Sequence, residues 1–391
     1  MTMTEKLYDG DSYITEFECK AVDLYTTGNH ICLILDRTAF FPEGGGQTSD
    51  RGWLNNMNVE NVQIIDGKII HFVENSEENV KKLEIGAHLA GKIDFKKRFS
   101  DMQQHSGEHI FSGIVHKLYG YNNVGFHLGS EVVTLDFDGE FSEEDICKVE
   151  SLVNKAVWDN LEIRILFPTD EELKTIDYRS KIEIEGQTRL VEIPGVDMCA
   201  CCAPHVRRTG EIGTVMVVGY ERYKGGTRIS ILCGERALTD IRHKLNENKK
   251  VSVLTKAKQE ETSAAVERLL EENERLKYEI VGLNRRFIKD EAERISPSDR
   301  IIIFDSRLKD KLLSDFTLSI MDKATCFAAC FCEDREIIRY CIAGKSTDLR
   351  PLAKKLNTKF SGRGGGRPEI VQGSLAAATE EGLRAFLNAE C

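Results

Sequence analysis

The amino-acid sequence predicts a multidomain protein of the mixed α+β class, and three observations indicate this. The chain has 391 residues, enough for about two to four domains that each bury a core of their own. Its first quarter is a series of short apolar runs separated by Gly, Asn and Asp, which is typical of β-structure. Later stretches repeat apolar residues at helical spacing, and the composition, 41% hydrophobic and 30% charged, is that of a soluble protein.

Residues 1–93 are expected to form a β-barrel-like domain. The runs ICLILDR, GWLNNMNVENVQII and KIIHFVE alternate or cluster apolar residues, with turn-forming residues between them. Residues 94–245 mix both patterns and predict an α+β domain. In this segment a helix carries QQHSGEHIFSGIVHKLYG, a second helix opens at Ser142 with a sequence resembling a capping box, and KIEIEGQ predicts an alternating strand.

Residues 250–296 predict one long coiled-coil helix that ends near Ser296-Pro297. Its heptad core positions are Val266, Leu269, Asn273, Leu276, Ile280, Leu283 and Phe287. All but one are apolar, and a single Asn is a common register-fixing exception. A hairpin folded back on itself is disfavoured because no Gly or Pro turn interrupts the pattern. We expect a homodimer formed through this helix and the C-terminal domain, although a long helix docked elsewhere would show the same pattern. Residues 300–391 predict a small α/β domain with a glycine loop, SGRGGGRP, before a C-terminal helix.

Cysteine content and the N-terminus indicate a cytoplasmic location. The opening MTMTEKLYDGDS lacks the apolar core that a secretory signal needs, and no run approaches the length of a membrane span. Twelve cysteines in such a chain suit a reducing compartment, where thiols serve as core residues or metal ligands. The net charge of −11 argues against a surface coated for nucleic acid, but it does not exclude a local basic surface.

The stretch QQHSGEHIFSG contains two histidines that could share one metal ion. His105 and His109 are four residues apart, so on a helix they lie on one face. The fragment also fits H-x-x-E-H, a zinc-peptidase pattern in which Glu108 would be the base and Glu185 a third ligand. A third interpretation is one core histidine and one surface histidine without a metal.

A second cluster, MCACCAPHV, favours a zinc site that is not a peptidase site. Pairing His-x3-His with Cys-x3-His yields a four-ligand set of His105, His109, Cys201 and His205. Thiolate and imidazole are preferred zinc donors, whereas the peptidase pattern has no use for a Cys–His pair. The alternative is that these cysteines pack as small hydrophobic residues.

A third motif, FFPEGGGQTSDRG, places three glycines before Gln47. Glycines tolerate positive φ, so a plain hairpin turn explains this motif. A functional interpretation is a backbone loop that approaches a phosphate or a ribose, with Gly45, Gly46 and Gln47 binding substrate. Gly-Gly-Gln is also the tripeptide that peptide release factors use against the ester of peptidyl-tRNA.

Taken together, FFPEGGGQTSDRG, MQQHSGEH, CCAPHVRRTGEIG and SGRGGGRPEIVQGS occur in an order and at separations that identify a family. Essentially the whole chain resembles the long form of AlaX, the free-standing alanyl-tRNA editing proteins, which are related to the editing and C-terminal portions of alanyl-tRNA synthetase. The resemblance implies a β-barrel-like N-terminal domain, an α+β editing domain, a coiled coil and a small C-terminal domain related to the DHH-associated module.

The resemblance also implies a reaction. Such proteins hydrolyse the ester that joins a wrong amino acid to tRNA-Ala, with serine the expected error and glycine second, because one pocket for alanine cannot exclude both strongly. They hold one zinc ion through His-x3-His and Cys-x3-His, which correspond to His105, His109, Cys201 and His205. Whether the zinc ion activates water or positions the substrate is left open by the sequence.

Two departures from the family pattern concern the zinc loop and the glycine loop. The family often reads Cys-Gly-Gly-Thr-His where this chain has Cys-Cys-Ala-Pro-His, so Cys199 and Cys202 compete with Cys201 as the ligand. Thr48 stands where a proline is frequent.

Further site residues follow from position. Phe126 and His127, in VGFHLGS, stand where the family lines its amino-acid pocket, although a core histidine at the start of a strand is an equal alternative for His127. Glu108 is the candidate general base.

Local positive charge is expected to bind tRNA. Lys96, Lys97 and Arg98 precede the histidine helix, and Arg207 and Arg208 follow the zinc loop. The basic residues of the C-terminal run AKKLNTKFSGRGGGR are Lys354, Lys355, Lys359, Arg363 and Arg367. Charge runs are often only solvated faces, and we interpret residues 96–98 taken alone in this way. The C-terminal run differs because it flanks a glycine loop able to present backbone N–H groups to phosphates. By resemblance the C-terminal domain grips the outer elbow of tRNA.

Two other functions compete with a deacylase. One is a non-catalytic tRNA-binding protein whose zinc is structural, and the other is an H-x-x-E-H metallopeptidase. GKS at 344–346 is not a P-loop, because Arg339 stands where the first glycine is needed. The chain is also too short for an aminoacylation domain in front of an editing domain, so a complete synthetase is not expected.

Overall fold

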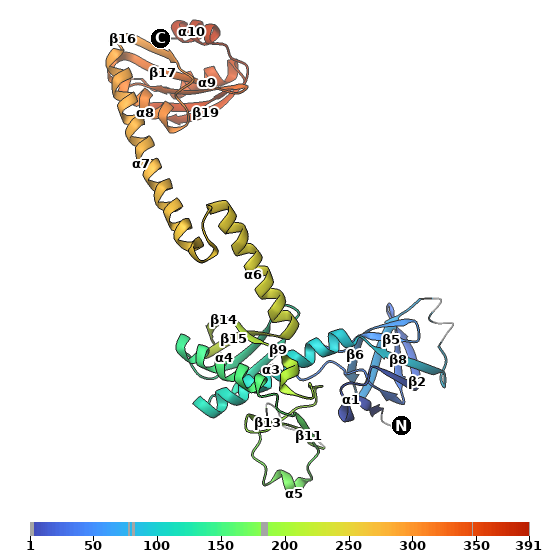
Figure 1. Cartoon of the computed structure of the whole chain (residues 1–391). Coiled ribbons are helices and arrows are strands. Elements are labelled where there is room, and N and C mark those ends of the chain that lie inside the picture. Colours follow the sequence, from blue (N-terminus) through green and yellow to red (C-terminus); the bar gives the residue numbers. More distant parts are fainter. Residues whose placement is uncertain (1–3, 77–78, 80–82, 181–186, 346, 391) are drawn as a thin grey trace. The chain divides into compact units, whose positions relative to one another are not determined.

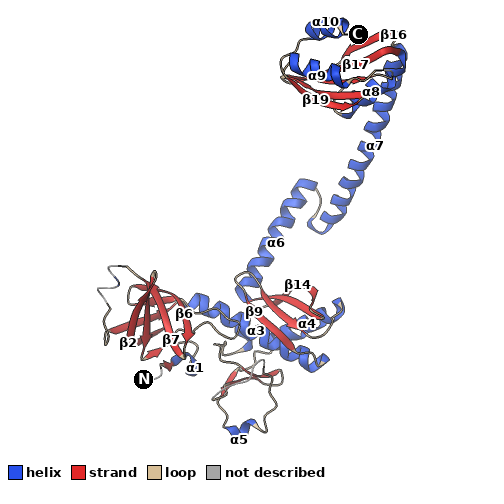
Figure 2. Ribbon diagram, turned by 180° about the vertical axis from the view of Figure 1, so that it is seen from behind, coloured by secondary structure: helices blue, strands red, loops and turns tan. Residues whose placement is uncertain are grey.

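The structure is a computed structural model that describes residues 4–76, 79, 83–180, 187–345 and 347–390. The chain divides into two compact units, Met1–Lys249 and Lys250–Cys391. Helices and strands are mixed in both, so the α+β multidomain class predicted from the sequence is confirmed (Figures 1 and 2). In the described part of the chain, no helix combines the length and the apolar character needed to cross a lipid bilayer.

The first part of the first unit is a closed barrel with strand order β2-β3-β7-β6-β5-β8 (blue in Figure 1). Its strands are β2 (Glu16–Thr27), β3 (His30–Leu35), β5 (Gly52–Leu54), β6 (Met57–Ile65), β7 (Lys68–Glu74) and β8 (His88–Ile93). Alternation places one face of each strand in the interior; in β8, Leu89, Gly91 and Ile93 are buried and the residues between them are exposed. A short helix, α1 (Leu7–Gly10), and the pair β1 (Glu5–Lys6) and β4 (Arg37–Thr38) lie beside the barrel.

The long helix α3 (Phe95–Tyr119) leads from the barrel into the second domain. It begins at Asp94, whose carboxylate accepts a hydrogen bond from the Lys97 backbone N–H, and it ends at Gly120 in the left-handed conformation. Every residue from 101 to 115 is buried. The histidine motif therefore lies in the interior of the domain and not on a solvent-facing helix.

Arg98 ties α3 to the barrel, which corrects the expectation that it belongs to a solvated basic face. Its side chain is fully buried, and its Nε donates to the Asp50 carboxylate at 2.8 Å. A second guanidinium nitrogen donates to the Ser12 carbonyl at 2.9 Å. A buried charge must be paired and hydrogen-bonded, and this one is, so Arg98 does not face a nucleic acid.

The second domain of this unit packs α3 and α4 (Glu143–Trp158) together and against a four-stranded sheet of order β14-β15-β10-β9. The capping box predicted at Ser142 is confirmed, with Asp145 as its partner. The remaining elements are β9 (Asn123–Leu128), β10 (Val133–Phe137), β14 (Val215–Tyr223), β15 (Gly226–Cys233), a second sheet of β11 (Arg164–Leu166), β12 (Leu190–Ile193) and β13 (Asp197–Ala200), the short helix α5 (Asp170–Leu173) and the 3-10 turn η1 (Thr209–Ile212). The expected strand KIEIEGQ, with Glu185 as a zinc ligand, falls mainly on residues 181–186, outside the described residues.

The helical region differs from the single helix expected over residues 250–296. Helix α6 (Gly234–Thr255) ends first, and α7 (Thr262–Arg294) begins after the short turn η2 (Gln259–Glu261). Lys256 has a φ of 54°, and the Ala257 N–H donates to the Ser252 carbonyl at 3.1 Å. This is a Schellman-type helix end with lysine at the position where glycine is usual, so the sequence showed no stop signal.

The predicted heptad side chains of α7 mostly remain exposed within a single chain. Leu269 is 57% exposed and Ile280 is 55% exposed. Phe287 is different, because its ring packs 6.2 Å from that of Phe316 in the C-terminal domain. The side chain at the last heptad position therefore packs within this unit, whereas those at the earlier positions remain exposed.

The C-terminal domain is a five-stranded sheet of order β16-β17-β18-β20-β19 with three helices. Its elements are β16 (Ser298–Phe304), α8 (Lys311–Ile320), the 3-10 turn η3 (Met321–Lys323), β17 (Ala324–Asp334), β18 (Ile337–Ala343), α9 (Arg350–Lys359), β19 (Gly362–Arg367), β20 (Ile370–Leu375) and α10 (Glu380–Ala389). The expected glycine loop is wrong, because its glycines form the edge strand β19. A Cβ on Gly364 would lie 2.7 Å from the Tyr340 hydroxyl, so glycine permits a contact that a side chain would block.

Candidate metal centre

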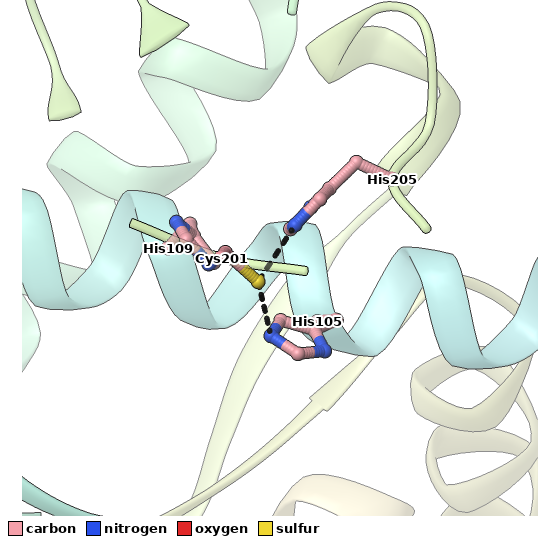
Figure 3. A group of neighbouring side chains, drawn as sticks. All are labelled: His105, His109, Cys201 and His205. Carbon is pink, nitrogen blue, oxygen red and sulfur yellow. Dashed lines mark hydrogen bonds between the residues drawn. The ribbon is translucent and has the colours of Figure 1, made fainter. Parts of the chain in front are cut away.

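Four side chains from distant parts of the sequence converge beside α3. His105 and His109 lie one turn apart on this helix, and Cys201 and His205 come from the loop that follows β13. Figure 3 shows all four pointing toward one another. One potential ligand atom from each lies within 4.8 Å of the others, so this group could hold a metal ion.

Each histidine uses its Nδ1 for a bond away from the cluster. The His105 Nδ1 lies 2.8 Å from the Gln47 Oε1, and the His109 Nδ1 lies 3.1 Å from the Asp197 Oδ2. The His205 Nδ1 lies 3.0 Å from the Ser106 Oγ. With Nδ1–H as the donor in each pair, every Nε2 keeps its lone pair for the cluster, which is the usual arrangement around a metal-binding histidine.

The electrostatics of the cluster favour a thiolate. Burial raises the pKa of Cys201, but the charge of His105 and hydrogen bonds to His105, His109 and His205 outweigh it and hold this pKa well below the usual value. Burial lowers the pKa of His205 to about 3, so this imidazole is neutral. A metal binds a thiolate and unprotonated imidazole nitrogens, so Cys201 and His205 are in the binding form, whereas the hydrogen bond to Asp197 raises the pKa of His109 above its usual value.

Neither Cys199 nor Cys202 belongs to the group that contains all three imidazoles. Cys199 is buried and groups with His109 and Asp197. Cys202 is at the surface, and its Sγ would lie 3.9 Å from a Cβ on Gly45. Burial raises the pKa of both thiols. The geometry therefore groups Cys201 with all three histidines, whereas Cys199 groups with His109 alone.

The glycine motif forms a tight turn that delivers Gln47 to the cluster. Gly44 and Gln47 exchange backbone hydrogen bonds of 3.0 and 3.1 Å, and Gly45 and Gly46 have φ values of 60° and 81°. Two central residues with positive φ define a type I′ turn. A Cβ on Gly46 would lie 2.6 Å from the Phe126 ring, so only glycine fits against β9 here.

The structure brings Phe126 to the cluster and places His127 elsewhere. The Phe126 and His105 ring centroids are 4.8 Å apart. His127 is exposed and, as the next residue of β9, points to the opposite face of the strand. Glu108 lies close by: its Oε2 is 3.9 Å from the His109 Nε2, and its Oε1 accepts hydrogen bonds from Ser112 at 2.6 Å and Asn123 at 2.7 Å.

Arg189 supports the loop that carries Cys201, and the sequence interpretation missed it. Its guanidinium donates to the Cys201 carbonyl at 2.6 Å and to the Ala203 carbonyl at 3.1 Å, while its own carbonyl accepts from the Cys201 N–H at 3.1 Å. Only 7% of Arg189 is exposed. An arginine twelve residues before a cysteine carries no recognisable signal in a sequence.

Ser106 and Asp197 were also missed, although one signal pointed to them. Metal-binding histidines commonly donate to a carboxylate or another acceptor, and Asp197 lies four residues before Cys201. Arg179 donates to both oxygens of Asp197, at 2.8 and 3.0 Å. This ion pair and the bond from His109 hold the pKa of Asp197 below its usual value despite burial.

The basic residues singled out for tRNA binding are partly engaged within the chain. Arg207 donates to Asp11 at 3.0 Å and stacks 4.2 Å above the Tyr13 ring, and Arg208 donates to the Asn160 carbonyl. Lys96 pairs with Glu235 at 3.4 Å.

In the C-terminal domain, Lys355 pairs with Glu390 at 2.6 Å, and the Lys359 ammonium lies 5.0 Å from the Phe386 ring centroid. Lys354 lines a cavity of about 280 Å³ between α9 and β19. Arg363 and Arg367 belong to the edge strand β19. The structure thus gathers these residues around one edge of the sheet.

Comparison with known proteins supports an editing function. Residues 12–97 match the family described as tRNA synthetases class II (A), and residues 188–230 match the threonyl and alanyl tRNA synthetase second additional domain. The alanyl-tRNA editing protein AlaX-L of Pyrococcus horikoshii is 26% identical over 97% of this chain and 96% of its own length. An alanine–tRNA ligase of Methanobrevibacter smithii is 28% identical over 95% of this chain, which is 44% of the ligase. AlaX-M of Saccharolobus solfataricus is 32% identical over 58% of this chain and 98% of its own length, and the chain belongs to this family of alanyl-tRNA editing proteins.

Proposed function

We propose that this protein is a trans-editing aminoacyl-tRNA deacylase, which hydrolyses the ester of mischarged tRNA-Ala with serine as the main error and glycine second. Its membership in the alanyl-tRNA editing family supports this reaction. The observation that carries the proposal is the convergence of three imidazoles and one thiol beside a Gly-Gly-Gln turn. A second site of this kind is needed because a pocket for alanine discriminates only modestly against glycine or against one added hydroxyl.

One zinc ion per chain is the metal that best suits this cluster. Zinc binds Cys at about 2.3 Å and His at about 2.0–2.1 Å in a tetrahedron, so a sulfur and a nitrogen ligand should lie about 3.5 Å apart. The Cys201 Sγ lies 3.5 Å from the Nε2 of both His105 and His205. When bound, zinc supplies a Lewis acid that can polarise an ester carbonyl.

Gln47 and Phe126 are the residues we assign to substrate binding around the metal. The Gln47 Nε2 is buried and has no hydrogen-bond acceptor among the residues that the structure describes. A donor of this kind can stabilise the carbonyl oxygen of an ester as charge develops on it. Phe126 covers His105 and excludes water from that side, and Gly45 and Gly46 offer exposed backbone. Glu108, near His109, is the candidate to accept the proton of the attacking water.

Binding of tRNA is assigned mainly to the C-terminal domain. Lys354, Arg363 and Arg367 gather along α9 and β19, where phosphates could be neutralised. Secondary contacts to tRNA are assigned to Lys355 and Lys359, which lie on the same helix as Lys354. They are also assigned to Arg207 and Arg208, which follow the zinc loop. Such binding should weaken steeply with added salt. The exposed heptad face of α7 is assigned to a coiled coil between two copies of the chain in the cytoplasm.

Hydrolysis of Ser-tRNA-Ala beside Ala-tRNA-Ala tests the proposed reaction. We expect the zinc-loaded protein to release serine much faster than alanine, and to leave peptides intact. A folded, zinc-loaded protein that hydrolyses neither ester would contradict the proposal and favour a non-catalytic tRNA-binding protein. Cleavage of peptides without ester hydrolysis would instead favour the metallopeptidase interpretation.

A further inference from the structure

A polar cavity of about 470 Å³ lies next to the metal cluster in the first unit. This volume is within the range of about 300–1,000 Å³ that small-molecule sites occupy. Three of the segments that line it also build the metal centre: Thr48, Ser49 and Arg51 follow Gln47, residues 128–130 follow Phe126, and Lys97 and Asp101 precede His105 on α3. The rest of the lining consists of Glu43, Glu60, Asn61 and Arg236. The metal-binding and substrate-binding roles assigned above give this cavity no function.

Each of the three segments connects a residue at the cluster to residues that line the cavity. On α3, Asp101 lies one turn before His105, about 6 Å along the helix axis, and Lys97 lies about 12 Å before it. The Gln47 side chain bonds His105, and the Lys97 ammonium bonds Thr48 Oγ1 at 3.0 Å and the Ser49 carbonyl at 2.8 Å. The cavity therefore adjoins the metal centre through residues of α3 and of the glycine turn.

The floor of the cavity is held by hydrogen bonds and ion pairs within the protein. Asp101 is 1% exposed and accepts from Lys97 at 2.7 Å and from Arg236 at 2.7 Å. Arg236 also donates to the Gly129 carbonyl at 2.9 Å and to the Ser100 hydroxyl at 2.9 Å. One buried carboxylate therefore holds two cations, and these cations bond the segments around Ser49 and Gly129 on either side of the cavity without a ligand.

The charges of the lining suit a neutral polar group. Arg51, Lys97 and Arg236 are matched by Glu43, Glu60 and Asp101, three cations against three carboxylates. Hydroxyl and backbone groups at Thr48, Ser49, Gly129 and Ser130 add donors and acceptors. Within the described residues the Arg51 guanidinium makes no hydrogen bond or ion pair, so it can donate to a ligand. A nucleoside, with its hydroxyl-rich sugar and hydrogen-bonding base edge, fits this lining better than a phosphate.

We infer that this cavity receives the terminal nucleoside of the tRNA, the one that carries the amino-acid ester. The inference rests on the proposed function and adds a second binding element to it: the metal centre takes the ester, and the cavity holds the nucleoside about one helical turn away. Binding energy from this part of the substrate would align the ester with the metal centre.

A cavity-filling substitution tests this assignment. Ser130 is exposed at the cavity, so Ser130→Trp fills it without disturbing the core, and Ser151→Trp on the exposed side of α4 is the matched control. The probes are 3′-O-seryl-adenosine, serine methyl ester and a stable amide, 3′-deoxy-3′-serylamino-adenosine. For Ser130→Trp we expect the Kd of the amide to rise at least about ten-fold, equivalent to about 1.4 kcal/mol. We also expect kcat/KM for the seryl-adenosine, relative to that for the methyl ester, to fall by a similar factor.

Ser151→Trp should leave both quantities unchanged. Arg51→Ala, which removes the unpaired guanidinium, provides a second variant and should weaken amide binding several-fold. An unchanged Kd in both cavity variants, from a wild type that deacylates Ser-tRNA-Ala, would overturn the cavity assignment and leave the proposed function standing. A wild type that does not deacylate Ser-tRNA-Ala at all would overturn both.

Discussion

The Nδ1 of His105 lies 2.8 Å from the Oε1 of Gln47, a residue 58 positions earlier in the chain. This bond joins the glycine turn, which belongs to the barrel end of the unit, to the helix that carries two of the four candidate ligands. Gln47 therefore orients the metal ligand His105 through its Oε1. Its Nε2 remains available beside the metal cluster.

Replacement of Gln47 by leucine should weaken zinc binding. Leucine is similar in size but cannot accept the His105 Nδ1–H, so the imidazole loses the partner that fixes its orientation. We expect zinc affinity to fall about 10–100-fold, measured by competition with a chelator. Gln63→Leu, on barrel strand β6, is the matched control. Unchanged zinc affinity in Gln47→Leu would show that the bond does not support the site.

Arg189 should strengthen zinc binding by holding the loop that carries Cys201. Arg189→Met removes the donor to the Cys201 and Ala203 carbonyls, and Arg189→Lys restores only part of it. We expect zinc affinity to fall about ten-fold or more in the methionine variant and less in the lysine variant. The thiolate charge-transfer band of the cobalt-substituted protein should shift as well. Arg164→Met, at an exposed position on β11, is the control. A wild-type cobalt spectrum in Arg189→Met would rule out a positioning role.

Much of the fold and of the candidate site could be predicted because the signals are local. Alternating apolar residues predict the barrel strands, and His-x3-His with Cys-x3-His predicts the group that the structure brings together. The partners of these ligands could not be predicted in the same way. Ser106, Gln47 and Asp197 come from three different segments, and only tertiary packing reveals which of them meets which imidazole.

The misinterpreted elements have identifiable physical causes. Glycine usually marks a turn, yet the glycines of β19 form a strand because their lack of side chains permits close contact with Tyr340. Conversely, Lys256 takes the left-handed conformation that usually requires glycine, so the sequence did not predict the end of α6. Arg98 was grouped with surface charges because its burial depends on a carboxylate 48 residues away. For β19 and Arg98 a long-range contact overrides the local preference, whereas the end of α6 rests on local backbone hydrogen bonds around one lysine with positive φ.

The barrel should lose stability in mild acid through His71. Burial lowers the pKa of this histidine to about 4, and its ring lies between the Thr38 hydroxyl and the Leu33 carbonyl. In the unfolded chain the pKa is about 6.5, so between pH 6.5 and pH 4 the unfolded state binds a proton that the folded state does not. Stability is therefore full above pH 6.5 and falls as the pH is lowered, by about 2 kcal/mol at pH 5.

Urea unfolding at pH 7.5 and pH 5 measures this effect. The chain has two tryptophans, so in a Trp158→Phe background Trp53 of strand β5 reports on the barrel. His71→Gln should reduce the pH dependence, whereas His88→Gln, at an exposed position of β8, should not. An equal pH dependence in His71→Gln would assign the acid sensitivity to other groups.

The exposed heptad face of α7 should make the protein a dimer. Leu276 and Ile280 are core positions of the heptad, and both are exposed in a single chain. Leu276→Glu with Ile280→Glu places charge in the seam, so we expect the sedimenting mass to fall from that of two chains to that of one. Glu274→Lys, at a heptad position away from the seam, should leave the dimer intact. A wild type that sediments as one chain would contradict the proposed coiled coil.

The most direct test of the account compares Cys201→Ala with Cys202→Ala, two substitutions at adjacent residues that differ in their place at the site. For each, zinc content and the hydrolysis of Ser-tRNA-Ala are measured beside the wild type. We expect Cys201→Ala to lose zinc and most of the serine-specific hydrolysis, because its Sγ lies among the three imidazoles. Cys202→Ala should keep its zinc. If Cys201→Ala retains zinc and deacylates Ser-tRNA-Ala like the wild type, the metal centre described here does not carry the editing reaction.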